Sequence, residues 1–218
     1  MENGASLVLP LLISVDNSPF INIFIVTLLI NRKLWYMRKL KVTEMNRISV
    51  EEYRECEKIP LVVVLDHVRS LYNVGSVFRT SDAFRVEGIC LCGITATPPN
   101  VEIHKTALGA EESVDWKYYG KTEDAVDKLH REGFTVLAIE QCEGSTMLGD
   151  FRVEEGKKYA IVFGNEVKGV QQQVVDMCDG CIEIPQYGTK HSLNVSVTAG
   201  IVIYNVASLL DANLACFR

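Results

Sequence analysis

The chain has 218 residues, of which 48% are hydrophobic, 8% aromatic and 23% charged. This composition is that of one ordinary globular domain with a sizeable core, and the chain contains no internal repeat or low-complexity tract. The net charge is −6 at pH 7, which excludes a general positive field that would attract nucleic acid. A nucleic-acid partner would therefore have to be held by a local basic patch.

The first 36 residues differ from the rest. Two apolar runs, 6–15 and 20–30, are separated by a polar segment. The second has 11 residues, fewer than the roughly 20 needed to cross a bilayer, and no signal-peptide pattern is present. The segment could bind a membrane, pack on a partner, or be upstream sequence translated from a start codon chosen too early. We favour the last interpretation, with Met37 as the start, and expect no stable membrane association.

A short basic arm and one α/β domain are predicted to follow, at residues 37–58 and 59–218. Apolar, β-branched runs predict strands, and apolar residues at helical spacing predict helices. Strands are expected at 61–68, 88–94, 113–120, 134–141 and 159–166, and helices at 73–84, 122–131, 170–177 and 192–208. Asn73, Thr122 and Ser192 are placed to cap three of these helices. Crossovers of this length predict a mostly parallel sheet with helices on both faces.

Seven cysteines form an odd set without the spacing of a disulfide framework. This is typical of reduced thiols in a cytosolic protein, so we expect a cytoplasmic location. Cys178 and Cys181 form a CxxC pair, but no second pair or histidine cluster stands at zinc-finger spacing. We therefore expect no metal, and the pair is interpreted as small residues at a helix-to-strand turn.

Polar residues gather after three predicted strands, at 73–80, 163–169 and 184–194. Parallel sheets bind ligands at these carboxyl ends. No dinucleotide-binding, P-loop or serine-elbow motif is present. In the first segment Arg79 either reaches solvent or faces an anion, and it is expected near the same side of the helix as Asn73. In the second, Glu166 is either a solvated turn residue or a side chain fixed at the mouth of a site.

The third segment contains His191-Ser192-Leu193-Asn194, which suggests a nucleophile beside its base, a helix cap or a ligand pocket. Neighbouring residues point apart, so His191 is poorly placed as the base for Ser192. A cap explains Ser192 but leaves Asn194 without a role. A buried asparagine at the start of an apolar helix needs hydrogen-bond partners, which a ligand or a neighbouring loop could supply.

Taken together, "NVGSVFRTSDAF", "IVFGNEVKGV" and "IPQYGTKHSLNVSVTAGIVIYNV" resemble the three motifs of the SpoU/TrmH family of SPOUT RNA methyltransferases. The resemblance covers residues 59–210, with the motifs in the family's order. It implies a parallel α/β sheet whose C-terminal part is threaded into a deep trefoil knot. It also implies a homodimer that uses S-adenosylmethionine to methylate a ribose 2′-hydroxyl in RNA.

The resemblance assigns roles by motif position. The residues implied in catalysis are Asn73, Arg79, Glu166, Ser192 and Asn194. Those implied to line the cofactor pocket are Glu140, Gly164, Asn165, Ile184, Gln186 and Leu193. Because an arginine is a poor proton acceptor, we expect Arg79 to clamp a phosphate beside the target ribose.

The resemblance favours tRNA over rRNA as the substrate, because relatives of this minimal size include tRNA-directed enzymes. Basic residues in or beside the motifs, such as Arg69, Lys168 and Lys190, could form a local basic face. The alternatives are an rRNA ribose methyltransferase and, in a different class, a noncatalytic RNA-binding protein of the same fold.

Overall fold

The structure is a computed structural model that describes residues 38–210, so the predicted extension 1–36 lies outside the described residues. The chain divides into two compact units, the first ending at Arg47 and the second beginning at Ile48. In the first unit, the 3-10 helix η1 (Val42–Glu44) is closed by an ion pair between Arg38 and Glu44 at 2.9 Å. The second unit contains the entire sheet.

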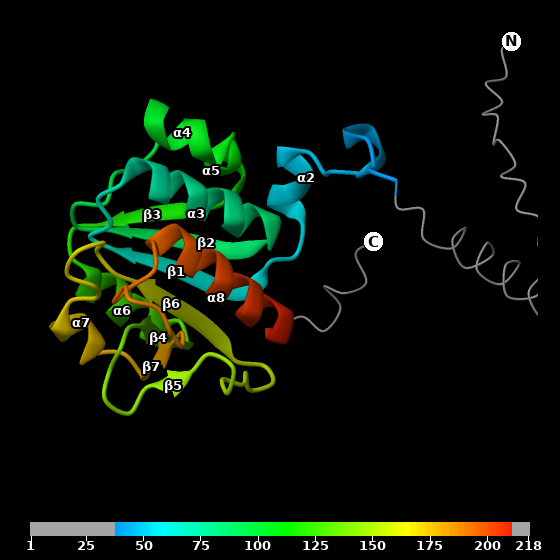
Figure 1. The fold of residues 1–218 in the computed structure, drawn as a ribbon. Coiled ribbons are helices and arrows are strands. Elements are labelled where there is room, and N and C mark those ends of the chain that lie inside the picture. Colours follow the sequence, from blue (N-terminus) through cyan, green and yellow to red (C-terminus); the bar gives the residue numbers. More distant parts are fainter. Residues whose placement is uncertain (1–37, 211–218) are drawn as a thin grey trace, which may run out of the picture. The chain divides into compact units, whose positions relative to one another are not determined.

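The sheet has seven parallel strands (Figure 1). They are β1 (Ile59–Asp66), β2 (Val86–Cys92), β3 (Trp116–Tyr119), β4 (Phe134–Ile139), β5 (Thr146–Met147), β6 (Lys158–Phe163) and β7 (Gly180–Glu183). Their order is β3-β2-β1-β6-β4-β7-β5. Strands β2 and β3 are added on one side of β1, and the later strands are added on its other side. The strand order therefore reverses at β1. Open parallel sheets bind ligands at the carboxyl ends of the strands next to such a reversal.

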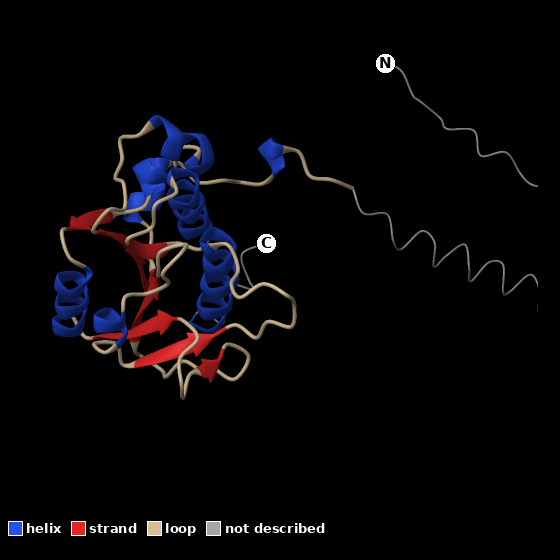
Figure 2. Cartoon of the chain, turned by 60° about the vertical axis from the view of Figure 1, so that its left-hand side comes forward, coloured by secondary structure: helices blue, strands red, loops and turns tan. Residues whose placement is uncertain are grey.

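Helices cover both faces of the sheet (Figure 2). They are α2 (Val50–Glu55), α3 (Leu71–Ala83), α4 (Val101–Ala107), α5 (Ala110–Ser113), α6 (Thr122–Arg131), α7 (Gln172–Val175) and α8 (Val195–Leu210). Side chains of β1 alternate between two cores: Leu61 and Val63 pack with α3 and α8, while Val62 and Val64 pack with α6 and α7. The predicted α/β class, with a parallel sheet covered on both faces, is confirmed.

The C-terminal segment returns across the sheet. Strand β7 lies between β4 and β5, close to one edge, whereas α8 packs with α3 over the interior strand β1. Residues 184–194 make the connection at the carboxyl ends of the strands. This return crossing fits the predicted C-terminal trefoil knot.

The first predicted helix cap is wrong. Helix α3 begins at Leu71, and its cap is Ser70, whose hydroxyl accepts a hydrogen bond from Asn73 N. Helix α6 begins at Thr122 as predicted, but the Thr122 hydroxyl donates to Asp66 at 2.5 Å instead of capping the helix. The side chains of both predicted caps make tertiary contacts.

The cap predicted at Ser192 is also wrong, because α8 begins only at Val195. The side-chain oxygen of Asn194 accepts hydrogen bonds from Ser196 N at 2.9 Å and Val197 N at 3.4 Å. Asn194 is therefore the residue that caps α8.

The segment between β2 and β3 holds two helices, α4 and α5, that the pattern did not predict. A strand predicted from residue 113 therefore starts only at Trp116. Gly75 allows α3 and α4 to approach closely, because an added Cβ would overlap the Ile103 carbonyl oxygen and the Thr106 hydroxyl.

Candidate functional site

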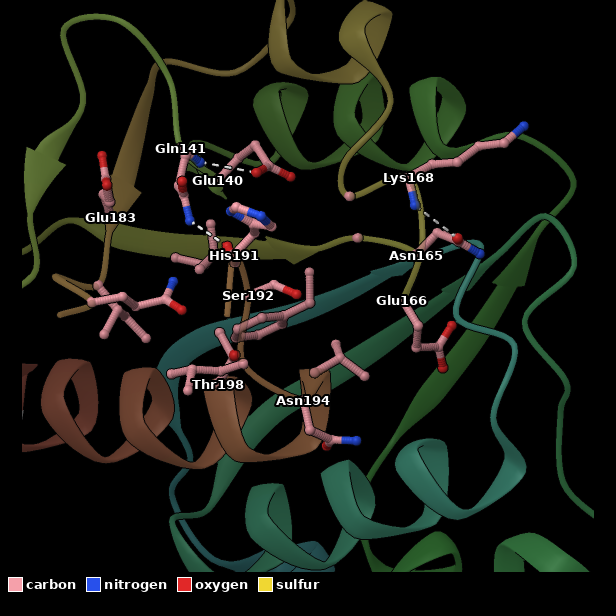
Figure 3. Close-up of a pocket in the computed structure, with 18 of the residues that line it drawn as sticks. Glu140, Gln141, Asn165, Glu166, Lys168, Glu183, His191, Ser192, Asn194 and Thr198 are labelled. Carbon is pink, nitrogen blue, oxygen red and sulfur yellow. Dashed lines mark hydrogen bonds between the residues drawn. The ribbon is translucent and has the colours of Figure 1, made fainter. Parts of the chain in front are cut away.

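A pocket of about 540 Å³ lies at the carboxyl ends of the neighbouring strands β6, β4 and β7 (Figure 3). One wall is the β6 loop (residues 164–169), and the opposite wall is the C-terminal loop (residues 185–193). Glu140 and Gln141 lie at the end of β4, while Ile139, Phe163 and Ile182 contribute apolar surface. Its volume is within the range of about 300–1,000 Å³ typical of small-molecule pockets.

The β6 loop is a tight turn. Asn165 and Gly169 exchange two backbone hydrogen bonds of 2.9 Å, and Asn165 Oδ1 accepts from Val167 N at 2.9 Å. At Gly164 an added Cβ would overlap the backbone of Gly169, so the turn needs glycine there. Asn165 Nδ2 donates to the His67 carbonyl at 2.7 Å, which ties the loop to the end of β1.

Glu166 connects the β6 loop to the start of α3. Its carboxylate accepts hydrogen bonds from Arg69 N at 3.0 Å, Ser70 N at 2.9 Å and Asn73 Nδ2 at 3.0 Å. Burial by itself would raise the pKa of Glu166, but hydrogen bonds led by those from Arg69 and Ser70 lower the pKa overall. Glu166 is thus ionised at neutral pH with both oxygens bonded, which suits positioning rather than accepting a proton.

Asn73 extends this connection to the third motif. Its Oδ1 accepts a hydrogen bond from Asn194 Nδ2 at 3.2 Å. Asn194 is exposed, although a buried side chain was predicted, and its partners are Asn73 and the start of α8. Glu166, Asn73 and Asn194 therefore form a chain of hydrogen bonds with one residue from each motif. We call this chain the motif bridge.

Two more carboxylates fix the far end of the β6 loop. Glu140 Oε2 accepts from Val170 N at 3.0 Å, and the buried Asp66 accepts from Gln171 N at 2.9 Å. Burial acts to raise the pKa of Asp66, but its hydrogen bonds, first that from Gln171 N and then that from Thr122, lower it overall. The sequence interpretation missed Asp66. The available signal was a carboxylate directly after the apolar run of β1.

The C-terminal loop makes far fewer hydrogen bonds to the rest of the described chain than the β6 loop does. Among the hydrogen bonds of residues 38–210, one joins residues 185–193 to the rest of the chain: Gln141 Nε2 donates to the His191 carbonyl at 2.8 Å (Figure 3). Ser192 is exposed and makes no hydrogen bond within the described part of the chain. Tyr187 is 95% exposed.

Arg79 is not among the residues that line the pocket. Six residues along a helix correspond to a rotation of about 120° away from Asn73. Asn73 is buried, while Arg79 is exposed and forms no hydrogen bond or ion pair with the residues described. The prediction that both lie near the same side of the helix is wrong. All predicted site residues other than these two line the pocket: Glu140, Gly164, Asn165, Glu166, Ile184, Gln186, Ser192, Leu193 and Asn194.

Within residues 38–210, no group of His, Cys, Asp or Glu side chains is arranged to hold a metal ion. Burial raises the pKa of Cys178 to about 12, and its thiol donates to the Val174 carbonyl at 3.2 Å, as expected of a packed thiol. None of the helices described is both long enough and apolar enough to span a bilayer.

Comparison with known proteins identifies the family. The model of the SpoU rRNA Methylase family matches residues 60–204. A Staphylococcus aureus protein assigned to the TrmH family of tRNA/rRNA methyltransferases is 32% identical over 158 residues, which are 72% of this chain and 62% of that protein. The chain belongs to the SpoU/TrmH family, and the predicted resemblance is confirmed. This chain spans about three fifths of the length of such relatives.

Solved structures share the fold. An AdoMet-bound rRNA methyltransferase from Sinorhizobium meliloti has a TM-score of 0.66 and 27% identity, over 73% of this chain and 60% of that chain. A TrmH/SpoU tRNA modifying enzyme from A. aeolicus has a TM-score of 0.67 and 25% identity, over 77% of this chain and 83% of that chain. These neighbours confirm the predicted SPOUT fold.

Proposed function

We propose that this protein is an S-adenosylmethionine-dependent RNA methyltransferase that methylates a ribose 2′-hydroxyl in tRNA. The observation that carries the proposal is the motif bridge, which joins one residue from each of the three motif segments beside one pocket. The AdoMet-bound S. meliloti relative supports the choice of cofactor. The family membership supports RNA as the substrate.

The pocket suits S-adenosylmethionine in size and chemistry. Ile184 and Leu193 offer apolar surface for an adenine ring, and the turn around Gly164 brings backbone groups close to a ligand. Glu140 and Glu166 line the same pocket, and their negative charge favours a cationic sulfonium. When bound, the cofactor supplies an activated methyl group.

The residues of this chain then have to align the 2′-oxygen and stabilise its surroundings. Ser192 and Asn194 line the pocket, where they can hold the ribose or the loop by hydrogen bonds. Arg79 clamps a phosphate beside the ribose, and its charge lowers the pKa of the hydroxyl. The hydroxyl proton leaves to phosphate or water, since the oxygens of Glu166 are already engaged.

Cations near the pocket mouth provide the local basic patch that the net charge of −6 does not. Lys168 lines the pocket, and Arg69 lines a smaller hollow on the other side of Glu166. Lys190 is exposed on the C-terminal loop. No carboxylate in residues 38–210 forms an ion pair with any of the three. They are therefore available to RNA phosphates.

The choice of tRNA rests on the A. aeolicus relative, which is a tRNA modifying enzyme. The shared part is 83% of that chain but 60% of the S. meliloti rRNA methyltransferase. The shared fold thus makes up most of the A. aeolicus chain, whereas about two fifths of the S. meliloti chain lies outside it. The protein should be assayed with tRNA and with rRNA from a strain lacking its gene, followed by nucleoside mapping. A 2′-O-methylated nucleoside in rRNA would redirect the proposal, and absence of both methylation and cofactor binding would favour the noncatalytic alternative.

The role of Arg79 is tested by Arg79→Ala. We expect methylation to fall by about 10²-fold or more, because the phosphate would lose its cation. Cofactor affinity should change less than about twofold, because Arg79 is exposed and does not line the pocket. Calorimetry and a single-turnover assay measure the two quantities. Arg131→Ala, an exposed arginine at the end of α6, is the matched control. Loss of cofactor binding in Arg79→Ala would overturn the clamp role.

We also propose that the protein is a homodimer. Helix α8 exposes an apolar stripe with Val197 at 52%, Ile201 at 40% and Tyr204 at 61% exposure, at the spacing of one helix face. A second copy would bury this stripe. Ile201→Asp should give a monomer in size-exclusion chromatography with light scattering. Val101→Asp, at an exposed apolar residue of α4, should leave the mass unchanged. A wild-type protein that is monomeric would contradict the proposal.

A further inference from the structure

Gln141 spans the two walls of the pocket. Its backbone N donates to Glu140 Oε1 at 2.9 Å, and Glu140 Oε2 accepts from Val170 N at the end of the β6 loop. At its other end, the Gln141 side chain donates to the His191 carbonyl at 2.8 Å (Figure 3). The backbone of Gln141 is therefore fixed to the well-held wall, while its amide reaches the C-terminal loop.

The hydrogen bond from Gln141 to the His191 carbonyl is important for the loop, although it is exposed to solvent. It is the one bond that joins residues 185–193 to the rest of the part of the chain described. Those residues supply Gln186, His191 and Leu193 to the pocket lining. If the loop moved outward, a bound ligand would lose these contacts at once.

We propose that Gln141 is a positioning residue that latches the C-terminal loop over the bound cofactor. This inference rests on the proposed function, because the cofactor is taken to be S-adenosylmethionine. The latch selects the binding-competent arrangement of the loop before the cofactor arrives, so the apparent affinity depends on how often the loop is closed. Gln141 acts through the loop and needs no contact with the reacting atoms.

The expected effect follows from the strength of one hydrogen bond. Losing a neutral bond of this kind should weaken cofactor affinity about three- to tenfold. The Michaelis constant for S-adenosylmethionine should rise by the same factor, whereas kcat should change less than twofold, because the aligned complex is unaltered once formed. If Gln141 had only a structural role, its substitution would lower the melting temperature and would not raise the Michaelis constant while leaving kcat unchanged.

The test uses Gln141→Met, which keeps the length of the side chain but removes its N–H donor. Gln141→Glu, which directs a carboxylate at the His191 carbonyl, should weaken binding further. Gln172→Met is the matched control, since Gln172 makes an exposed amide hydrogen bond to Asp176 at 2.7 Å on α7 and does not line the pocket. The full-length proteins are titrated calorimetrically with S-adenosylmethionine, and their melting temperatures are compared.

Limited trypsin digestion gives a readout that does not depend on the ligand. The exposed Lys190 precedes the latched carbonyl, so cleavage after Lys190 should be faster in Gln141→Met than in wild type. The cofactor should protect wild type more than the variant.

An unchanged dissociation constant in Gln141→Met would overturn the latch, whatever the cleavage rate. A wild-type protein that does not bind S-adenosylmethionine would instead overturn the proposed function, and the cofactor role of the latch with it. Weaker binding of the variant, with faster cleavage and an unchanged melting temperature, supports the inference.

Discussion

The two walls of the pocket are stabilised very differently. The β6 loop is bonded to the end of β1 through Asn165, to α3 through Glu166 and to the loop after β4 through Glu140 and Val170. Within residues 38–210, the C-terminal loop has one such bond, from Gln141. Segments with few internal bonds open at low free energy, whereas well-bonded ones open only with larger parts of the fold. One wall therefore shapes the pocket permanently, and the other can admit and release a ligand.

A matched pair of glycine substitutions would test this difference most strongly. Gly164→Ala places a Cβ on the backbone of Gly169, and overpacking of this kind costs about 1–3 kcal/mol or more. The melting temperature should fall by roughly 2–12 °C, with loss of cofactor binding. Gly188→Ala adds a Cβ that meets nothing within 4 Å and should shift the melting temperature by less than about 2 °C. Equal shifts in thermal unfolding would contradict the difference between the walls.

Acid should weaken the well-bonded wall by protonating its carboxylates. The folded state lowers the pKa of Asp66 from its ordinary value of 3.8 and that of Glu166 from 4.5. Their contribution to stability is thus complete above pH 4.5 and is lost as the pH falls through the lowered folded-state values. Thermal unfolding between pH 7 and pH 3 measures this loss. A melting temperature that stays constant as the pH decreases below 4.5 would argue against this contribution of the two carboxylates.

Glu166→Gln should have a smaller effect at neutral pH, because it changes one carboxylate that is partly exposed to solvent. We expect a loss of about 1–2 kcal/mol, since an amide cannot replace all the hydrogen bonds to Arg69 N, Ser70 N and Asn73. Glu155→Gln, at an exposed glutamate without such contacts, should be neutral. The difference in melting temperature between wild type and Glu166→Gln should shrink as the pH falls through the lowered folded-state pKa of Glu166, because the wild-type side chain then becomes neutral as well. A constant difference would show that charge is not the cause.

The sequence predicted five of the seven strands but missed β5 and β7, and it predicted the helix starts less well. Continuous apolar runs identified β1, β4 and β6, because strands buried on both faces need apolar side chains throughout. Helix starts depend on which polar side chain is free to cap. Asn73 makes contacts with residues more than 90 positions away, which no local pattern reveals.

The resemblance to the family implied the pocket lining, and those residues meet in space because they follow strands whose carboxyl ends lie together. The direction of Arg79 was mistaken, although helical rotation alone would have placed it about 120° from Asn73. Gln141 was missed for a different reason. Its contact is with a backbone carbonyl 50 residues away, and a backbone acceptor leaves no residue-type signal in the sequence.

The position of β1 between β2 and β6, inside the sheet, has a consequence for how the chain folds during synthesis. One neighbour, β2, follows soon after β1, but the other, β6, is made roughly a hundred residues later, as the separation of 98 residues between His67 and Asn165 shows. Until β6 leaves the ribosome, one edge of the buried, largely apolar strand β1 has no partner. Long-range parallel pairing of this kind folds slowly, and exposed strand edges are prone to aggregate. The nascent chain should therefore depend on chaperones until β6 has been added.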